Sequence, residues 1–176
     1  MLKVLIADDE EKICQLIIKL INWEEMGLKI AATASNGIEA LEQAKICKPE
    51  ILITDIRMPG IDGMELIRKV KEKLPDTEII IISGYRHFEY AQTAIRYGVR
   101  NYLLKPIKKE ELRDTLQKIA DIYREKNEQL NFEERVRLAL KNDAGKLRTS
   151  FISRMIYGDR ERENIISLKE LNNQYH

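Results

Sequence analysis

The fold of this chain is decided by one stretch, residues 51–63, which reads Ile51-Leu52-Ile53-Thr54-Asp55-Ile56-Arg57-Met58-Pro59-Gly60-Ile61-Asp62-Gly63. It begins with a short apolar run that is typical of a buried strand, and a carboxylate, Asp55, ends this run. Pro59 and Gly60 then predict a loop, and Asp62-Gly63 predicts the start of a helix. The stretch therefore predicts a strand-loop-helix unit with an acidic residue at the carboxyl end of the strand.

The same unit recurs from residue 1 to about residue 120. Short apolar runs alternate with longer segments whose apolar residues have the spacing of a helix that packs one face on a sheet. The other runs are residues 4–7, 30–32, 79–82 and 102–104. The helical stripes are Ile13, Leu16, Ile17, Leu20 and Ile21; Ile38, Leu41 and Ala44; Leu66, Ile67 and Val70; and Phe88, Ala91 and Ile95. Five such units predict an α/β fold with a five-stranded parallel, doubly wound sheet.

The pattern changes after residue 108, where no further strand is predicted. Leu112, Leu116, Ile119 and Tyr123 form the stripe of one last helix, and helical composition continues beyond it. We expect a first domain over residues 1–122 and a helical extension, the start of a linker region, over residues 123–176. A helix that outlasts its domain predicts either a coiled-coil homodimer or docking to an output domain, and the sequence leaves both open.

Composition excludes several classes of protein. The 30 basic and 29 acidic residues give a net charge of +1, which argues against coating nucleic acid as the main role of these 176 residues. Cys14 and Cys47 lack the spacing of a zinc site or a disulfide framework, so we expect two buried thiols in a reducing compartment. No signal peptide and no membrane-length apolar run is present, so we expect a cytoplasmic protein with no membrane partner.

Polar residues stand where the predicted strands end. Asp8-Asp9, Asp55, Ser83 and Lys105 follow or close four different strands. The carboxyl ends of parallel strands lie along one edge, so these side chains are expected to converge there. Clustered carboxylates repel one another unless a cation such as Mg²⁺ joins them. An aspartate beside a metal, a lysine and a hydroxyl suits phosphoryl transfer, and Asp55 is the best candidate for the nucleophile.

These residues together resemble the receiver domain of two-component response regulators. The resemblance covers residues 1 to about 122 and is carried by Asp8-Asp9, residues 55–63, residues 83–85 and residues 102–106. It implies a flavodoxin-like sheet of order 2-1-3-4-5. It also implies that Asp55 accepts a phosphoryl group from a phosphohistidine of a sensor histidine kinase, which changes the face formed by helix 4, strand 5 and helix 5.

The resemblance also implies a role for each matching residue. Asp9, Asp55 and the backbone carbonyl of Arg57 would bind Mg²⁺, and Asp8 would assist through water. Lys105 and Ser83 would contact phosphoryl oxygens, and Tyr102 would be the aromatic switch. The Lys105–Pro106 peptide bond is cis in this family.

Two further stretches, residues 83–91 and 102–107, resemble receivers joined to an AraC-type helix-turn-helix output domain. Residues 147–159 are similar to the start of the helical region that often links the two parts. No helix-turn-helix pattern follows in this chain. We therefore expect a piece of a longer transcription regulator, which contacts DNA only through a C-terminal domain missing here.

Two alternatives differ in class. A degenerate receiver would act only as a protein-interaction module, although the complete residue set argues against it. A phosphatase of the haloacid-dehalogenase type also uses an aspartyl nucleophile, but it needs a second aspartate two residues later, where this chain has Arg57. The preferred interpretation is a switch that phosphorylates and dephosphorylates itself, not a turnover enzyme.

Overall fold

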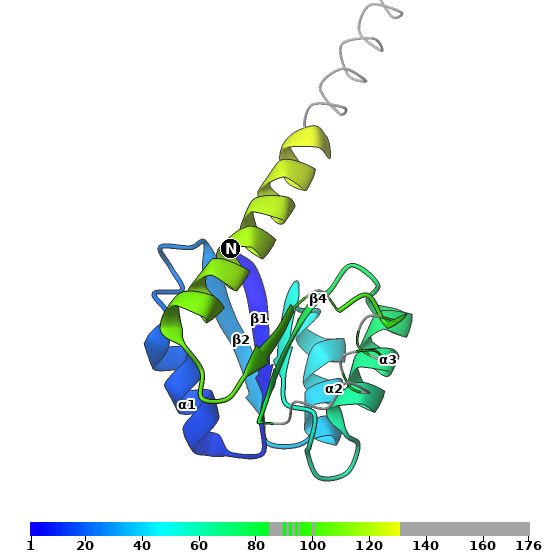
Figure 1. Ribbon diagram of the computed structural model, residues 1–176. Helices are drawn as coiled ribbons and strands as arrows, with labels where there is room; N and C mark the ends of the chain where they lie inside the picture. The colour runs from blue at the N-terminus through cyan, green and yellow to red at the C-terminus, as the bar shows by residue number, and fades with distance from the viewer. Residues whose placement is uncertain (85–89, 91, 93, 95, 100, 131–176) are drawn as a thin grey trace, which may run out of the picture. The chain divides into compact units, whose positions relative to one another are not determined.

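Figure 1 shows a computed structural model of the chain, which describes residues 1–84, 90, 92, 94, 96–99 and 101–130. Strands and helices alternate in the order β1 (Leu2–Ala7), α1 (Glu11–Leu20), β2 (Leu28–Ala34), α2 (Gly37–Cys47), β3 (Ile51–Thr54), α3 (Gly63–Lys73), β4 (Glu78–Ser83) and β5 (Asn101–Leu104). Residues 90, 92, 94 and 96 are also helical, and a last helix runs from residue 109 to residue 130. The chain divides into two compact units, residues 1–124 and 125–176, and the whole sheet lies in the first.

The five strands form one parallel sheet in the order β2-β1-β3-β4-β5. This confirms the predicted doubly wound α/β fold and its flavodoxin-like strand order. β1, β3 and β4 are the inner strands, and β3 is buried along its whole length. Their carboxyl ends lie along one edge of the sheet, as parallel pairing requires.

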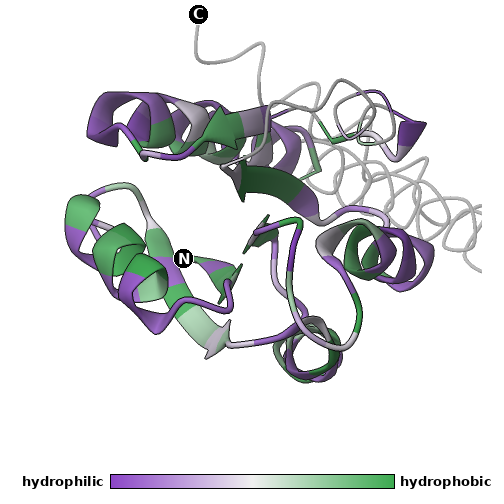
Figure 2. Cartoon of the chain, turned by 60° about the horizontal axis from the view of Figure 1, so that its bottom comes forward, coloured by the Kyte–Doolittle hydropathy of each residue, from purple (hydrophilic) through white to green (hydrophobic). Residues whose placement is uncertain are grey.

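Two apolar cores lie on opposite faces of the sheet. On one face, side chains of α1 and of the last helix pack against Val4, Ile6 and Ile53. On the other face, side chains of α2 and α3 pack against Leu5, Leu52 and other strand residues. Figure 1 shows this division of helices between the two faces. In the cartoon of Figure 2 the strands are mostly green (hydrophobic), whereas green and purple (hydrophilic) residues alternate along the helices.

Two of the predicted helix stripes are wrong in part. Ile38 is 53% exposed and Leu16 is 42% exposed, although both were assigned to core faces. The inner face of α2 is instead formed by small residues, Gly37, Ala40 and Ala44. A Cβ atom at position 37 would lie 2.1 Å from the carbonyl oxygen of Ile61, so the close approach of this loop selects which face turns inward.

The predicted helix start at residues 62–63 is confirmed, and α2 begins in the same way at residues 36–37. The Asn36 side chain accepts a hydrogen bond from the amide of Glu39 at 2.9 Å, and the Asp62 side chain accepts one from Glu65 at 2.8 Å. Such caps satisfy amides that have no partner within the helix. The stripe of Phe88, Ala91 and Ile95 lies outside the described residues.

The cysteines differ from the prediction in one respect. Cys14 is buried, but Cys47 is only partly buried. None of the described helices is long and apolar enough to cross a membrane.

A hydrogen-bond network closes the end of the sheet opposite the carboxyl edge. The Tyr123 hydroxyl, on the last helix, contacts the carbonyl oxygens of Glu50 and Asp76, which precede β3 and β4. The backbone amides and carbonyls of Lys3, Glu50 and Glu78 connect the same loops. Burial raises the pKa of Tyr123 to about 12. The last helix is therefore attached to the domain by a polar contact as well as by its apolar stripe.

Candidate functional site

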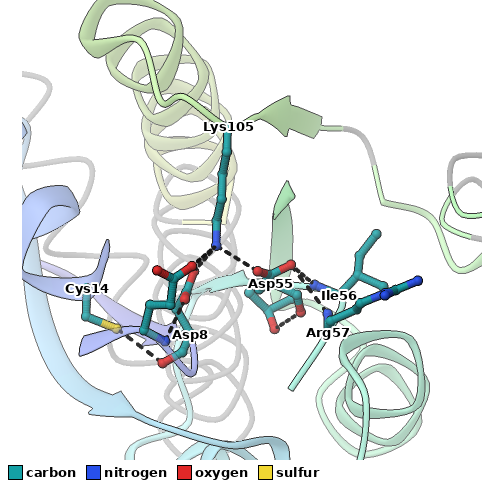
Figure 3. Close-up of polar contacts among 8 residues, drawn as sticks. Asp8, Cys14, Asp55, Ile56, Arg57 and Lys105 are labelled. Atoms are coloured by element: carbon teal, nitrogen blue, oxygen red, sulfur yellow. Dashed lines mark hydrogen bonds and ion pairs between the residues drawn. The ribbon is translucent and has the colours of Figure 1, made fainter. Parts of the chain in front are cut away.

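The strand ends bring the predicted residues together at the carboxyl edge of the sheet. β1 is followed by Asp8 and Asp9, β3 by Asp55 and β5 by Lys105, while Ser83 is the last residue of β4. Figure 3 shows the Lys105 side chain reaching between Asp8 and Asp55. The convergence expected from the sequence is therefore present.

Three carboxylates form the centre of this site. One oxygen from each of Asp8, Asp9 and Asp55 lies within 4.8 Å of the others. Asp8 and Asp55 are buried, whereas Asp9 is exposed. The cluster therefore opens to solvent on the side of Asp9 and is closed behind Asp8.

Lys105 neutralises part of this negative charge. Its ammonium donates to Asp55 Oδ2 at 2.7 Å and lies 2.9 Å from Asp8 Oδ2. A third carboxylate oxygen, Glu10 Oε1, lies 3.8 Å from the same nitrogen. The Lys105–Pro106 peptide bond is cis.

The pKa values of two groups show how burial and pairing compete here. Burial raises the pKa of Asp8 above its usual value, although hydrogen bonds from Lys105 and from the Glu10 amide act in the opposite direction. Burial alone lowers the pKa of Lys105, but its hydrogen bonds to Asp55 and Asp8 outweigh this and raise it. Lys105 is therefore an ammonium at neutral pH, held by two aspartates.

Asp55 is held from both its side chain and its backbone. Its Oδ1 accepts hydrogen bonds from the amides of Ile56 at 2.5 Å and Arg57 at 3.4 Å. The hydroxyl of Thr54 donates to the Asp55 carbonyl at 2.9 Å. Gly63 packs so closely that a Cβ atom there would lie 2.0 Å from the same carbonyl oxygen. Oδ1 thus faces the backbone, and Oδ2 faces Lys105.

Ser83 and Tyr102 lie on the neighbouring strands β4 and β5, two register positions apart. Ser83 is fully buried, and Tyr102 is partly buried. Burial raises the pKa of the Tyr102 phenol, and a side-chain hydrogen bond with Ser83 acts against that rise. The hydroxyl and the aromatic residue that the sequence singled out are therefore in direct contact.

The donor set fits a hard divalent cation. All three side chains offer carboxylate oxygens, which Mg²⁺ prefers, and the cluster holds more negative charge than Lys105 alone balances. Arg57 lies two residues beyond Asp55, where its carbonyl belongs to the same loop. Burial is the main cause of the raised pKa of Asp8, and the charge of Asp55 adds to it; a cation at this position would act against both.

Two residues at this site were not identified from the sequence. Thr54 is a buried polar residue at the end of an apolar strand, a signal that the sequence offered. Glu10 occupies the N-cap of α1 without forming a side-chain cap, and its proximity to Lys105 depends on the fold. Tyr85, part of the quoted motif, lies outside the described residues.

The chain belongs to the response regulator receiver domain family, whose model matches residues 4–117. It is 40% identical over 139 residues to the uncharacterized transcriptional regulatory protein YesN of Bacillus subtilis, which covers 76% of this chain and 38% of YesN. It is 40% identical over 107 residues to the transcriptional regulatory protein HptR of Staphylococcus aureus, covering 61% of this chain and 42% of HptR. The chain thus spans less than half the length of these curated relatives.

Two solved structures agree with the fold. The receiver domain of AraT, a response regulator from Geobacillus stearothermophilus, is 41% identical with a TM-score of 0.69, covering 72% of this chain and 98% of that one. A two-component transcriptional regulator AraC from Clostridium phytofermentans is 36% identical with a TM-score of 0.64, covering 69% of this chain and 94% of that one.

Proposed function

We propose that this chain is a phosphorylation-controlled switch that accepts a phosphoryl group on Asp55 from a phosphohistidine of a sensor histidine kinase. One observation carries the proposal. The Asp55 carboxylate lies at the carboxyl edge of the sheet, within an acidic cluster and 2.7 Å from the Lys105 ammonium. A receiver with this site is a signalling switch and not a turnover enzyme.

The chemistry needs only positioning and charge neutralisation. An Asp55 carboxylate oxygen forms a bond to phosphorus while the bond from phosphorus to the histidine nitrogen breaks, leaving an acyl phosphate and a free imidazole. Lys105 and Ser83 then contact the oxygens of the phosphoryl group. Ser83 ends β4, the neighbour of β3, whereas Lys105 follows β5, one strand further along the sheet. The Lys105 side chain already donates a hydrogen bond to the accepting carboxylate.

Asp8, Asp9, Asp55 and the Arg57 carbonyl are the groups that would hold Mg²⁺. The ion supplies positive charge against the charge on the equatorial oxygens during transfer. The close spacing of the three carboxylates supports this assignment. Asp8, the most buried of the three, is placed to act through a water molecule.

The contact between Ser83 and Tyr102 supports an output mechanism. Movement of Ser83 toward a phosphoryl group on Asp55 would change its hydrogen bond to Tyr102. Tyr102 then turns inward and alters the face formed by helix 4, strand 5 and helix 5, which biases a two-state element. Much of helix 4 lies outside the described residues.

In the longer protein, this switch controls transcription through a DNA-binding domain of the AraC type that is missing from this chain. The similarity to the response regulator AraT and to a two-component transcriptional regulator AraC supports this assignment. The protein acts in the cytoplasm, with a receiver over residues 1–122 and a linking extension over residues 123–176. That extension either forms a homodimer or docks to the output domain.

The two alternatives have less support. A degenerate receiver would not need three clustered carboxylates and a paired lysine. An aspartyl phosphatase of the haloacid-dehalogenase type would need an acid where Arg57 stands.

Phosphorylation with a small donor tests the proposal. The chain is incubated with Mg²⁺ and acetyl phosphate, and its intact mass is measured for the wild type, Asp55→Ala and Asp114→Ala. Asp114 is an exposed aspartate on the last helix and serves as the matched control. We expect one added phosphoryl group on the wild type and on Asp114→Ala, and none on Asp55→Ala. Equal addition to all three chains would refute Asp55 as the acceptor.

A further inference from the structure

Glu10 is a third acidic neighbour of Lys105 and differs in position from the other two. Its Oε1 lies 3.8 Å from the Lys105 nitrogen, beyond hydrogen-bond distance, whereas Asp55 and Asp8 lie at 2.7 and 2.9 Å. The Glu10 side chain is 65% exposed, against 2% for Asp8 and 10% for Asp55. Glu10 therefore stands at the rim of the site while the two aspartates lie within it.

Helix capping does not explain this glutamate. Glu10 is the N-cap residue of α1, but its side chain makes no cap hydrogen bond. In α2 and α3 the same position is held by Asn36 and Asp62, which do cap their helices. Glutamate is not among the residues that favour this position. Its backbone amide, however, donates to Asp8 Oδ1 at 3.0 Å, which fixes Glu10 beside the acidic cluster.

Lys105 and a divalent cation would compete for the same oxygens. Both hydrogen bonds of the ammonium fall on Oδ2 atoms of Asp8 and Asp55, two members of the cluster proposed for Mg²⁺. Two positive charges a few ångströms apart repel strongly in a partly buried site. Lys105 must therefore leave at least one of these aspartates when a cation is bound.

We infer that Glu10 is a positioning residue that receives the Lys105 ammonium when a divalent cation enters the Asp8–Asp9–Asp55 cluster. Closing the present 3.8 Å separation to the usual charge-assisted length of about 2.8 Å forms this contact without moving Lys105 out of the site. The ammonium then lies at the rim of the acidic site, beside Asp55, where it could contact a phosphoryl group on that residue. This inference rests on the proposed metal site.

A double-mutant cycle on Mg²⁺ affinity tests the inference. Calorimetric titration at low ionic strength gives the Kd for the wild type, Glu10→Gln, Lys105→Met and the double variant, all in the 176-residue chain. We expect Glu10→Gln to weaken Mg²⁺ binding about threefold when Lys105 is present, the size that a mostly exposed ion pair allows. In the Lys105→Met background the same change is expected to alter Kd by less than about 1.5-fold.

Glu11→Gln is the matched control, because Glu11 is the next residue, equally acidic and exposed. It is expected to alter Kd by less than about 1.5-fold in both backgrounds, since it removes charge without removing a partner of Lys105. Equal weakening by Glu10→Gln in both backgrounds would overturn the inference, because Glu10 would then act only through its charge. No Mg²⁺ binding by the wild type would instead refute the metal site itself, and the inference with it.

A crystal structure of the wild-type chain with Mg²⁺ provides a second measurement that does not depend on any variant folding. A Lys105 nitrogen within hydrogen-bond distance of Glu10 supports the inference. A Lys105 nitrogen still bonded to both Asp8 and Asp55 beside a bound ion overturns it.

Discussion

Asp8 shows how a single buried carboxylate is placed for function at a cost in stability. Burial holds its pKa above the usual value despite the hydrogen bond from Lys105, so its ionised form opposes folding at neutral pH. A cation beside it would reverse that effect. The side chain is therefore better explained by binding than by packing.

We predict that Asp8→Asn makes the metal-free protein more stable, by about 1 kcal/mol or roughly 2–4 °C in Tm. The amide keeps the shape of the side chain and removes its charge. Excess Mg²⁺ should raise the free energy of unfolding of the wild type by about 1.4 kcal/mol at ten times Kd, and with it the Tm, and should have little effect on the variant. Thermal unfolding with Mg²⁺ or with a chelator measures both effects. An Asp8→Asn protein that is less stable without metal would contradict this explanation.

Gly63 controls the backbone of the residue proposed as phosphoacceptor. A Cβ atom at this position would lie 2.0 Å from the Asp55 carbonyl oxygen, and the Gly63 amide donates to Ile56 at 2.7 Å. No side chain fits there without moving the loop that holds the carboxylate. Glycine is thus required at position 63 because the Asp55 backbone leaves no room for a Cβ atom, and not because of an unusual backbone angle.

We predict that Gly63→Ala destabilises the protein by about 2 kcal/mol or more and slows phosphorylation by acetyl phosphate. Gly84→Ala is the control for stability, because within the part of the chain that the structure describes no atom beyond the adjacent residues lies within 4 Å of a Cβ atom at that position. Urea unfolding of both variants is the measurement. Similar stabilities for the two variants would show that the loop adjusts to the added methyl group.

The helices and strands were predictable where the sequence pattern was compatible with only one kind of secondary structure. Runs such as residues 79–82 fit only a buried strand, and Asn36 and Asp62 are caps by their chemistry. The inward face of α2 was not predictable, because Ile38 and Ala40 both suit an amphipathic helix. The choice depends on the contact of Gly37 with Ile61, which is distant in sequence.

The site was predictable for the same reason that the sheet was. Once the strands are parallel, the residues that follow β1, β3 and β5 must meet at one edge. The role of Glu10 was not predictable, because it depends on a separation of a few ångströms between side chains. Thr54 differs, since a polar residue at the end of an apolar strand was visible in the sequence. Periodicity along a sequence contains no such distances.

The last helix gains stability from Tyr123 in a manner that depends on pH. The folded protein keeps the phenol protonated up to a pKa of about 12, whereas the unfolded chain releases the proton near the ordinary value of 10.0. The folded state therefore holds more protons between these values, and stability falls as pH rises through this window. Below it, the contribution of Tyr123 is constant.

We predict that Tyr123→Phe is less stable than the wild type by about 1–2 kcal/mol at neutral pH, since a hydroxyl that contacts two carbonyls is lost. The difference should shrink by about 1 kcal/mol between about pH 9 and about pH 11, because only the wild type has an ionisable phenol at position 123. Urea midpoints of both proteins give this difference. A constant difference would show that the hydroxyl does not titrate with the raised pKa.

For the molecule as a whole, Tyr123 also bears on the domain boundary. The sequence predicts a receiver over residues 1–122. In the structure the first compact unit ends two residues later, at Arg124. We predict that residues 1–124 fold alone with the stability of the first unit, and that residues 1–122 are less stable by about 1–2 kcal/mol. Thermal unfolding of the two fragments tests this. Equal stability would show that the Tyr123 contact is dispensable and that the shorter boundary is sufficient.

The Tyr123 contact has a mechanical consequence. In the last helix, residues 109–130, Leu112, Leu116 and Ile119 pack on the core and Tyr123 forms hydrogen bonds one turn beyond them. We expect a pull on the chain beyond residue 124 to load the Tyr123 hydrogen bonds first, before it reaches the apolar stripe. These bonds lie at the opposite end of the sheet from Asp55. The Tyr123 hydrogen bonds would therefore bear a force that acts on the chain beyond residue 124, and less of that force would reach Asp55.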